Sequence, residues 1–298
     1  MASGHGIHLV PDPLPASAEV GRAAELVYLK FGGSIITDKR VQDSLRVANL
    51  MRLASEVAAA MQQEDSLRLL IGHGGGSFAH FPASRWQVRL GSKAGLSAAE
   101  SLRGFAETRL AAGRLNQLVA EAFVTAGLPA VSFQPSASAV ATDGQLTSLD
   151  RTPLLTSLAL GCLPLVYGDA ILDTVRDYTV ISTEQLFFYL AQAEAALRPQ
   201  RVILVGEVDG VFTADPLKDE GAALIERING GNIDVVRGQL GGSYGVDVTG
   251  GMLTKIAEMY ALCQQVAGLQ VLLLNGNTPG LLQRALLGEP VRGTVIEG

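Results

Sequence analysis

Three glycine-rich turns are the segments of this 298-residue chain best suited to chemistry. Each follows a predicted strand or opens a predicted helix: Gly32-Gly33-Ser34, Gly74-Gly75-Gly76-Ser77 and Thr249-Gly250-Gly251. Backbone N–H groups at such turns converge on anions, because no side chain blocks a close approach and a helix N-terminus carries partial positive charge. One such turn is weak evidence, since most are only tight turns. Three of them at the carboxyl ends of strands, where open α/β sheets bind ligands, predict a site for phosphate groups.

A basic side chain lies near each turn. Lys30 precedes the first turn, Lys39 follows it, and Lys255 follows the third. Lys30 interrupts the apolar run LVYLKF, where burying an unpaired ammonium group is costly, so we expect an anion beside it. Two histidines bracket the second turn. We interpret His73 as structural, whereas His80 can direct a hydrogen-bond donor at bound phosphate.

Two common nucleotide-binding motifs do not fit this chain. It contains no Gly-Lys dipeptide, which excludes the P-loop GxxxxGK[ST]. The block GGGSFA (74–79) satisfies the loose GxGxxG/A pattern of dinucleotide-binding folds, but His80, Phe81 and Pro82 follow it instead of a long regular helix. The glycine turns therefore predict phosphate binding of another kind.

Composition limits the other classes of function. The chain has 23 Lys+Arg against 29 Asp+Glu, a net charge of −6, and no basic run, which argues against a nucleic-acid partner. No apolar run approaches the roughly 18 residues of a membrane span and no signal peptide opens the chain, so we expect a cytoplasmic protein with no membrane partner. Cys162 and Cys263 lie far apart, which predicts buried small side chains and no protein-held metal.

Short apolar runs alternate with amphipathic ones from Leu26 onward, which predicts an α/β fold with a largely parallel sheet. Asp143-Gly144 predicts a hairpin turn, and residues 170–181 predict a second hairpin. Residues 1–24 are predicted to be a mobile tail and 25–298 a single domain, softly divided near 197–200. The predicted strands are 26–31, 67–71, 130–133, 163–167, 202–205 and 271–274, and the predicted helices are 44–63, 97–126, 183–197 and 252–267.

Blocks spread along the whole chain, in order, resemble the amino acid kinase superfamily. They are LKFGGSIITDK (29–39), GHGGGSFAH (72–80), VDGVFTADP (208–216), DVTGGMLTK (247–255), NGN (275–277) and GTVIE (293–297). Within the superfamily, HGGGSFAH is similar to the motif of the isopentenyl phosphate kinase family. This resemblance implies a three-layer αβα sandwich and a homodimer. It also implies transfer of a phosphoryl group from ATP, with Mg²⁺, to isopentenyl phosphate, which gives isopentenyl diphosphate. Residues 25–199 would then form the acceptor-binding lobe and 200–298 the nucleotide-binding lobe.

The resemblance also implies roles for individual residues. Those expected to hold ATP are Lys30, Gly32, Gly33, Ser34, Gly76, Glu207, Gly251 and Lys255. Those expected to bind the acceptor phosphate are Gly75, His80 and Thr183. Those expected to act in catalysis are Lys30, Lys39, His80, Lys255 and Glu184. Such a set suits phosphoryl transfer, which needs mostly positioning and neutralisation of charge from the protein.

The chain departs from the family pattern at three places. It has Ser182-Thr183-Glu184-Gln185 where the family usually has SGDD, so the organising carboxylate is Glu184, one methylene longer than aspartate. The family's TDVDG is GEVDG (206–210) here, which places Glu207 at the nucleotide contact. Ala79 replaces the last glycine of the histidine motif.

The residues around the acceptor's hydrocarbon tail are the least readable part of the sequence. In the family, the helix after the glycine–histidine loop lines that pocket, and here its candidate lining residues are Phe105, Leu110 and Leu115, which also suit ordinary core packing. Two alternatives stay open at this stage: a kinase for another small phosphate or phosphonate such as fosfomycin, and a non-catalytic nucleotide- or oxyanion-binding protein. The presence of Lys30, Lys39 and Lys255 favours catalysis.

Overall fold

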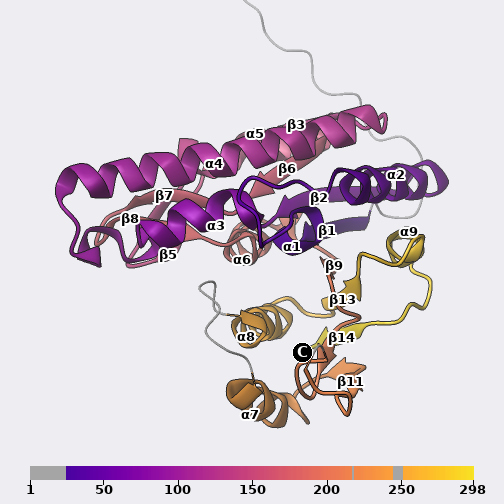
Figure 1. Ribbon diagram of the computed structural model, residues 1–298. Helices are drawn as coiled ribbons and strands as arrows, with labels where there is room; N and C mark the ends of the chain where they lie inside the picture. The colour runs from indigo at the N-terminus through magenta and orange to yellow at the C-terminus, as the bar shows by residue number, and fades with distance from the viewer. Residues whose placement is uncertain (1–24, 217, 244–250) are drawn as a thin grey trace, which may run out of the picture.

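A central sheet of eight strands organises the part of the chain that the computed structural model describes, residues 25–216, 218–243 and 251–298 (Figure 1). Its order is β12-β14-β13-β9-β1-β2-β6-β3, and only the β13/β14 pair is antiparallel. The six predicted strands are confirmed as β1 (Glu25–Phe31), β2 (Leu67–His73), β3 (Ala130–Ser132), β6 (Leu163–Tyr167), β9 (Arg201–Gly206) and β13 (Gln270–Asn275). The sequence analysis missed two edge strands, β12 (Arg227–Ile228) and β14 (Thr294–Glu297), because such short runs carry little periodicity.

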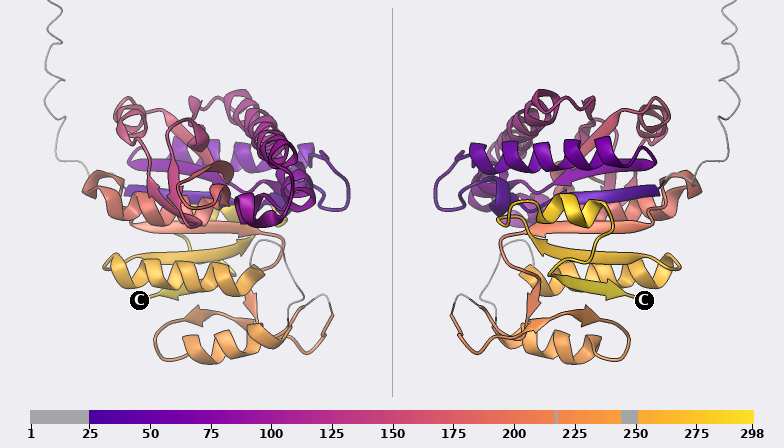
Figure 2. Two further views of the ribbon diagram at one scale, coloured as in Figure 1. Left: turned by 90° about the vertical axis from the view of Figure 1, so that its left-hand side faces the viewer. Right: turned by 90° about the vertical axis from the view of Figure 1, so that its right-hand side faces the viewer.

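Helices cover both faces of this sheet (Figure 2), which confirms the three-layer αβα sandwich. On β1, Val27, Leu29 and Phe31 pack into a core with α2 (Val47–Gln63), α4 (Ala98–Thr125) and α9 (Leu281–Leu286). The alternate residues Leu26 and Tyr28 pack into a core with α5 (Thr152–Ala159), α6 (Thr183–Ala193), α7 (Ile233–Ser243) and α8 (Gly251–Gln265) on the other face. Side chains alternate between the faces of a strand, so both cores follow from one apolar run.

Four of these helices, α2, α4, α6 and α8, are those that the sequence predicts, each slightly shorter than expected. The start of α6 matters for the site. Ser182 caps it by accepting a hydrogen bond from the Gln185 backbone N–H, and the Gln185 side chain accepts one from the Ser182 N–H. This capping box holds Glu184 in the first turn of the helix.

The glycine-rich turns open two short helices that the sequence analysis did not predict, α1 (Gly33–Ile36) and α3 (Gly76–Arg85). The helix after the second turn spans only 10 residues and contains Pro82, so it agrees with the expectation that no long regular helix follows this turn. A 3₁₀ segment, η1 (Val88–Ala94), comes next. It leads the chain from α3 to the long helix α4.

The two predicted hairpins are confirmed, and they join into one further sheet. Strands β4 (Val140–Thr142), β5 (Gln145–Ser148), β7 (Asp169–Asp173) and β8 (Asp177–Ile181) pair in the order β5-β4-β7-β8. Asp143 and Gly144 form the first turn with φ of 49° and 84°, the left-handed backbone that this kind of hairpin requires. Four short elements complete the description: β10 (Val211–Phe212), β11 (Leu224–Ile225), η2 (Pro135–Ala137) and η3 (Ala195–Leu197).

The sheet runs unbroken across the predicted division near residues 197–200. Strand β9 pairs in parallel with β1, so that Leu204 lies beside Lys30, and β2 places Gly72 on the other side of Lys30. The carboxyl ends of β1, β2 and β9 therefore lie level with one another. The predicted tail, residues 1–24, lies outside the described residues. Among the helices that the structure describes, none combines the length and apolar character of a membrane span.

Candidate active site

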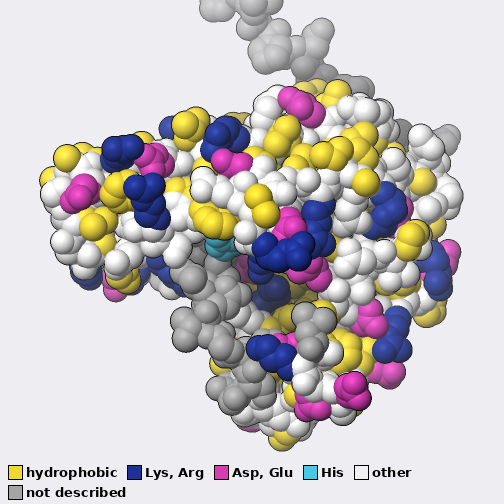
Figure 3. All heavy atoms as spheres, in the orientation of Figure 1, with side chains coloured by type: hydrophobic (Ala, Val, Ile, Leu, Met, Phe, Trp, Pro, Cys, Tyr) yellow, Lys and Arg dark blue, Asp and Glu magenta, His cyan; other side chains and the backbone are white. Residues whose placement is uncertain are grey.

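A cavity of about 460 Å³ opens at the carboxyl ends of β1, β2 and β9. Figure 3 shows the hollow on this face, between the part built on β1 and β2 and the part built on α7 and α8. All the predicted site residues except one line it: Lys30, Gly32, Gly33, Ser34, Lys39, Gly75, His80, Thr183, Glu184, Glu207, Gly251 and Lys255. Residues that the chain separates by more than 200 positions thus meet around one space.

Gly76 is the exception, because it packs against the first glycine turn instead of facing the cavity. A Cβ on Gly33 would lie 2.5 Å from the Cα of Gly76, so the two turns touch backbone to backbone. Gly76 also has φ of 51°, and a Cβ there would lie 2.4 Å from Oγ1 of Thr37. Glycine is needed at both places to bring the N-termini of α1 and α3 together at the cavity.

Lys30 has the anion that the sequence led us to expect, and that anion is Glu184. The Lys30 Nζ lies 2.7 Å from Oε1 of Glu184, and both side chains are less than 10% exposed. Burial raises the pKa of Glu184, but the positive charges of Lys30 and Lys255 and the hydrogen bond from Lys30 outweigh it, so this pKa lies below its usual value. The Glu184 carboxylate is therefore ionised, and its ion pair with Lys30 links the end of β1 to the start of α6.

Thr183 and His73 stabilise the floor of the cavity. The Thr183 hydroxyl donates to the carbonyl oxygen of His73 at 2.6 Å. The His73 ring is fully buried, stacks on Tyr167 with 5.5 Å between centroids, and has Nε2 3.2 Å from Oδ1 of Asn116. Burial lowers the pKa of His73 to about 4. These contacts support the structural interpretation of His73, and they show that the Thr183 hydroxyl is held by the protein.

Glu207 lies directly after β9, where it pairs with Arg46, the residue before α2. Its Oε1 is 3.0 Å from a guanidinium nitrogen of Arg46, and both side chains are more than a third exposed. Lys39, near the start of the loop between α1 and α2, is exposed and also lines the cavity. Both residues therefore belong to the entrance.

The sequence analysis missed four charged residues of this cavity: Arg89 on η1, Asp169 on β7, Asp215 in the loop after β10, and Glu258 on α8. Burial and the neighbouring Glu184 carboxylate raise the pKa of Glu258 to about 7. The one signal for Glu258 was its position three residues after Lys255, which places both on one face of a helix. Arg89 gave no signal, because an arginine between helices resembles any surface cation.

The predicted lining of the tail pocket was wrong. Phe105 packs on Tyr178, Leu110 is 65% exposed, and Leu115 is buried in the core between the sheet and helices α2, α4 and α9. The residues of α4 that face the cavity are the smaller Thr108 and Ala112, one turn apart. The size of a side chain did not predict which residues of α4 line the cavity. The packing of α4 against α3 determines which face of α4 is turned to the cavity, and only small side chains on that face leave the cavity open.

The comparisons with known proteins agree with this geometry. The model of the amino acid kinase family matches residues 25–275. The chain belongs to the amino acid kinase family. The isopentenyl phosphate kinase of Methanothermobacter thermautotrophicus is 40% identical over 280 residues, 92% of this chain and 99% of the relative. That of Methanocaldococcus jannaschii is 32% identical over 91% of this chain and 98% of the relative.

Solved structures of the amino acid kinase family share the fold. A structure described as "X-ray structures of isopentenyl phosphate kinase" superposes with a TM-score of 0.76 at 35% identity, over 91% of this chain and all of the other. An aspartate kinase from Synechocystis, with a TM-score of 0.61 at 16% identity, shares the fold alone. Membership of the amino acid kinase family makes the chain a phosphotransferase.

Glu258→Gln is expected to stabilise the protein at high pH. The folded-state pKa of Glu258 is raised from 4.5 to about 7, so its contribution to stability is fully present below the unfolded pKa and is lost as pH rises through 7. Glutamine carries no charge at any pH. The difference in the free energy of unfolding between Glu258→Gln and wild type is expected to grow by about 2 kcal/mol, in favour of the variant, from pH 5 to pH 8. This value is discounted for the partial exposure of the Glu258 side chain. Urea denaturation at both pH values measures it.

Glu220→Gln is the matched control for this prediction. Glu220 is exposed in a loop outside the cavity, so the same exchange there removes one charge from the protein without relieving a buried carboxylate. An equal gain for Glu258→Gln at pH 5 and pH 8 contradicts the raised pKa.

Proposed function

We propose that this chain transfers the γ-phosphoryl group of ATP to isopentenyl phosphate and so produces isopentenyl diphosphate. The observation that carries the proposal is the convergence of three lysines, His80 and glycines of all three glycine-rich turns on one cavity. Kinases need to bring two anions together, and such a set offsets their repulsion. The relatives named isopentenyl phosphate kinase, which match nearly their whole length, support this acceptor.

The nucleotide is assigned to the first and third glycine turns. Gly32, Gly33 and Ser34 offer backbone N–H groups at the end of β1, and Lys255 in the second turn of α8 lines the same cavity. Lys30 supplies its charge beside them while Glu184 fixes the position of its ammonium group. Glu207 at the rim is assigned to the outer part of the nucleotide, and Gly76 supports the turn from behind.

The acceptor is assigned to the second turn. Gly75 and His80 lie on α3 and its cap, so His80 can donate to an oxygen of the acceptor phosphate and orient it. A second oxygen of that phosphate attacks the γ-phosphorus, a new P–O bond forms, and the bond to the β–γ bridging oxygen breaks with its electron pair leaving on ADP. The acceptor oxygen is already anionic, so no general base is required. Thr183 contributes the cavity wall, since its hydroxyl donates to His73.

Lys39 is assigned to the phosphoryl group in transit, because its exposed and flexible side chain lies at the entrance of the cavity. Within the described ranges, no group of three or more His, Cys, Asp or Glu side chains is arranged to hold a metal ion. We therefore assign Mg²⁺ to the phosphate oxygens of ATP, where it would neutralise charge. The protein's own contribution is then made by its lysines and backbone amides.

Small apolar side chains support a short hydrocarbon tail. Ala79 and Ala83 of α3, Ala112 of α4, and Val180 and Ile181 of β8 line one part of the cavity. Each methylene buried there contributes roughly 0.8 kcal/mol. An isopentenyl tail has more carbon to bury than fosfomycin, so this wall favours the isoprenoid phosphate.

A panel of acceptors is expected to rank isopentenyl phosphate first. With about two more methylene equivalents buried than for fosfomycin, its kcat/KM is expected to exceed that of fosfomycin by about tenfold or more. The assay couples ADP release to a spectrophotometric readout, with ATP, Mg²⁺ and each monophosphate or phosphonate in turn. A higher kcat/KM for fosfomycin selects that acceptor instead, and ATP binding without turnover of any acceptor selects a non-catalytic binding protein.

We further propose that the enzyme is a cytoplasmic homodimer, with residues 25–199 holding the acceptor and residues 200–298 most of the nucleotide. Cavity residues support the division: His80 precedes it, whereas Gly251 and Lys255 follow it. Sedimentation equilibrium of the full chain tests the dimer.

A further inference from the structure

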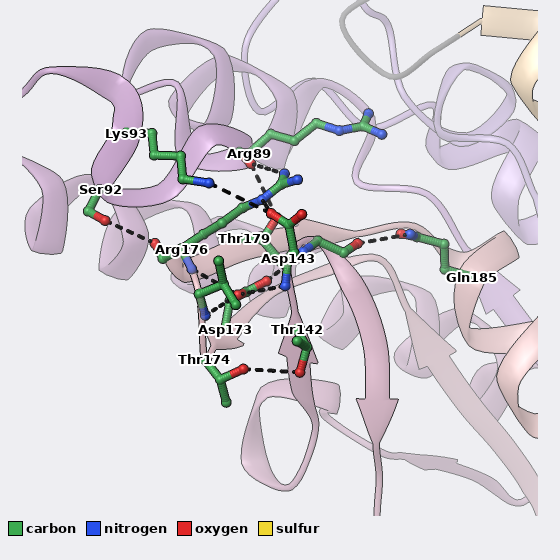
Figure 4. A network of polar contacts seen from close by, with 12 residues as sticks. Arg89, Ser92, Lys93, Thr142, Asp143, Asp173, Thr174, Arg176, Thr179 and Gln185 are labelled. Carbon is green, nitrogen blue, oxygen red and sulfur yellow. Dashed lines mark hydrogen bonds and ion pairs between the residues drawn. The ribbon is translucent and has the colours of Figure 1, made fainter.

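Arg89 is a cation of the active-site cavity to which the assignments above give no role. It lies on η1, outside the glycine turns, and its side chain is exposed to the cavity. Among the residues that the structure describes, none forms an ion pair or hydrogen bond with its guanidinium group. The positive charge of this group acts to lower the pKa of Glu258 on α8. Figure 4 shows this side chain pointing away from the polar network that surrounds its backbone.

That network holds the backbone of Arg89 firmly. Its carbonyl oxygen accepts hydrogen bonds from the Thr179 hydroxyl at 3.2 Å and from Nη1 of Arg176 at 3.4 Å. Two residues on, Gly91 has φ of 63°, and a Cβ there would lie 2.0 Å from the carbonyl oxygen of Arg176. The segment is thus pressed against strand β8 and its turn, where only glycine fits.

The turn that bears Arg176 is itself fixed. Asp173 accepts hydrogen bonds from the backbone N–H groups of Asp143, Gly144, Val175 and Arg176 at 2.7 to 3.0 Å. Nε of Arg176 donates to Asp143 at 2.8 Å (Figure 4). Both hairpins of the second sheet therefore brace η1. A rigid backbone under a side chain directed at the cavity is what orients a ligand-binding group.

The charge balance of the cavity favours a further cation such as the Arg89 guanidinium group when two phosphate esters are bound. Glu184 neutralises Lys30, and Glu258 adds a carboxylate on the side of α8. Two phosphate esters would bring several further negative charges. Arginine presents a planar fork of N–H donors that binds two phosphate oxygens at once, which a lysine cannot do.

The position of Arg89 indicates which phosphate it binds. It follows α3, which bears His80, and it lines the same cavity as Lys255 and Glu258 of α8. It is therefore placed between the acceptor side and the nucleotide side. We propose that Arg89 binds the phosphoryl group in transit, and hence the terminal phosphate of the diphosphate product. This inference rests on the proposed function for the identity of the acceptor.

Binding measurements on Arg89→Ala test the contact. Isothermal titration calorimetry is expected to show that the Kd for isopentenyl diphosphate rises about tenfold or more, in line with the loss of a charge-assisted contact. The Kd for isopentenyl phosphate, which lacks the terminal phosphate, is expected to change less than about threefold. Arg89→Lys, which keeps the charge and loses the fork, is expected to lie between wild type and Arg89→Ala.

Arg85→Ala is the matched control. Arg85 lies four residues earlier on α3, is exposed, and stacks on the Trp86 ring with 4.9 Å to its centroid instead of lining the cavity. A specific contact is supported if Arg85→Ala binds the diphosphate with wild-type affinity. The circular dichroism spectrum and Tm of Arg89→Ala must also equal those of wild type. Wild-type affinity in Arg89→Ala overturns the proposal, and so does an equal loss for monophosphate and diphosphate or an equal loss in Arg85→Ala.

The same contrast can be measured without the isoprenoid. If wild type binds neither isopentenyl ligand, the proposed acceptor is wrong, and titration with inorganic pyrophosphate and inorganic phosphate replaces that pair. A selective loss of pyrophosphate affinity in Arg89→Ala then supports the role of Arg89, and unchanged pyrophosphate affinity overturns it.

Discussion

His80→Ala is expected to lower kcat by about a hundredfold to a thousandfold, the usual effect of removing one donor that stabilises the transition state. His80 lines the cavity from α3, five residues after Gly75 at the N-cap of that helix, and it is only partly buried. Its loss is therefore expected to leave the fold intact. Steady-state kinetics with ATP and isopentenyl phosphate measure the change, and urea denaturation checks that the free energy of unfolding stays near the wild-type value.

His80→Gln refines this result, because glutamine keeps one N–H donor at nearly the same reach. We expect it to retain more activity than His80→Ala. Full activity in His80→Ala would remove His80 from the mechanism. A large fall in unfolding free energy for the same variant would show that His80 acts through the fold and not through the acceptor phosphate.

Glu184→Gln is expected to produce the second large effect, on both stability and turnover. It keeps the size of the side chain but leaves the Lys30 ammonium group buried without its counter-charge. Breaking a buried pair in this way usually costs about 3 to 5 kcal/mol. Lys30 would also lose the contact that holds it toward the phosphates, so we expect kcat to fall about tenfold or more.

The control for this prediction lies at the other end of the same helix. Glu194 pairs with Arg151 at 3.0 Å, with both side chains about a third exposed. Glu194→Gln is expected to cost less than about 1 kcal/mol, as exposed pairs usually do, and to leave kcat unchanged. If Glu184→Gln loses stability but keeps the wild-type kcat, the carboxylate is structural, and the longer side chain does not replace the family's aspartate in catalysis.

Much of the layout of this protein can be read from local patterns. The alternation of short apolar runs with amphipathic ones predicts six of the eight strands of the central sheet and its parallel character. The Asp143-Gly144 pair predicts a hairpin for a reason that needs no tertiary information, since its backbone must be left-handed. Both patterns depend on residues close together in the chain, so the strands and the hairpin can be predicted from the sequence alone.

The glycine turns can also be predicted from local sequence, and so can the need of the buried Lys30 for an anionic partner. A buried ammonium group requires an anion wherever it occurs. The identity of that anion is a different matter, because Glu184 lies more than 150 residues away and meets Lys30 only after β1 and α6 have packed on one another.

Side-chain direction on a helix was decided by packing alone. On α4, the sequence favours Phe105, Leu110 and Leu115 as pocket residues because they are large, yet the helix turns Thr108 and Ala112 toward the cavity. Arg89 and Glu258 entered the site in the same way, from segments without a recognisable motif. Sequence by itself determined which elements form and which residue types can handle phosphate. The tertiary structure decided which of them share a cavity, because contacts between distant segments depend on how helices and sheets pack, and no local period encodes that.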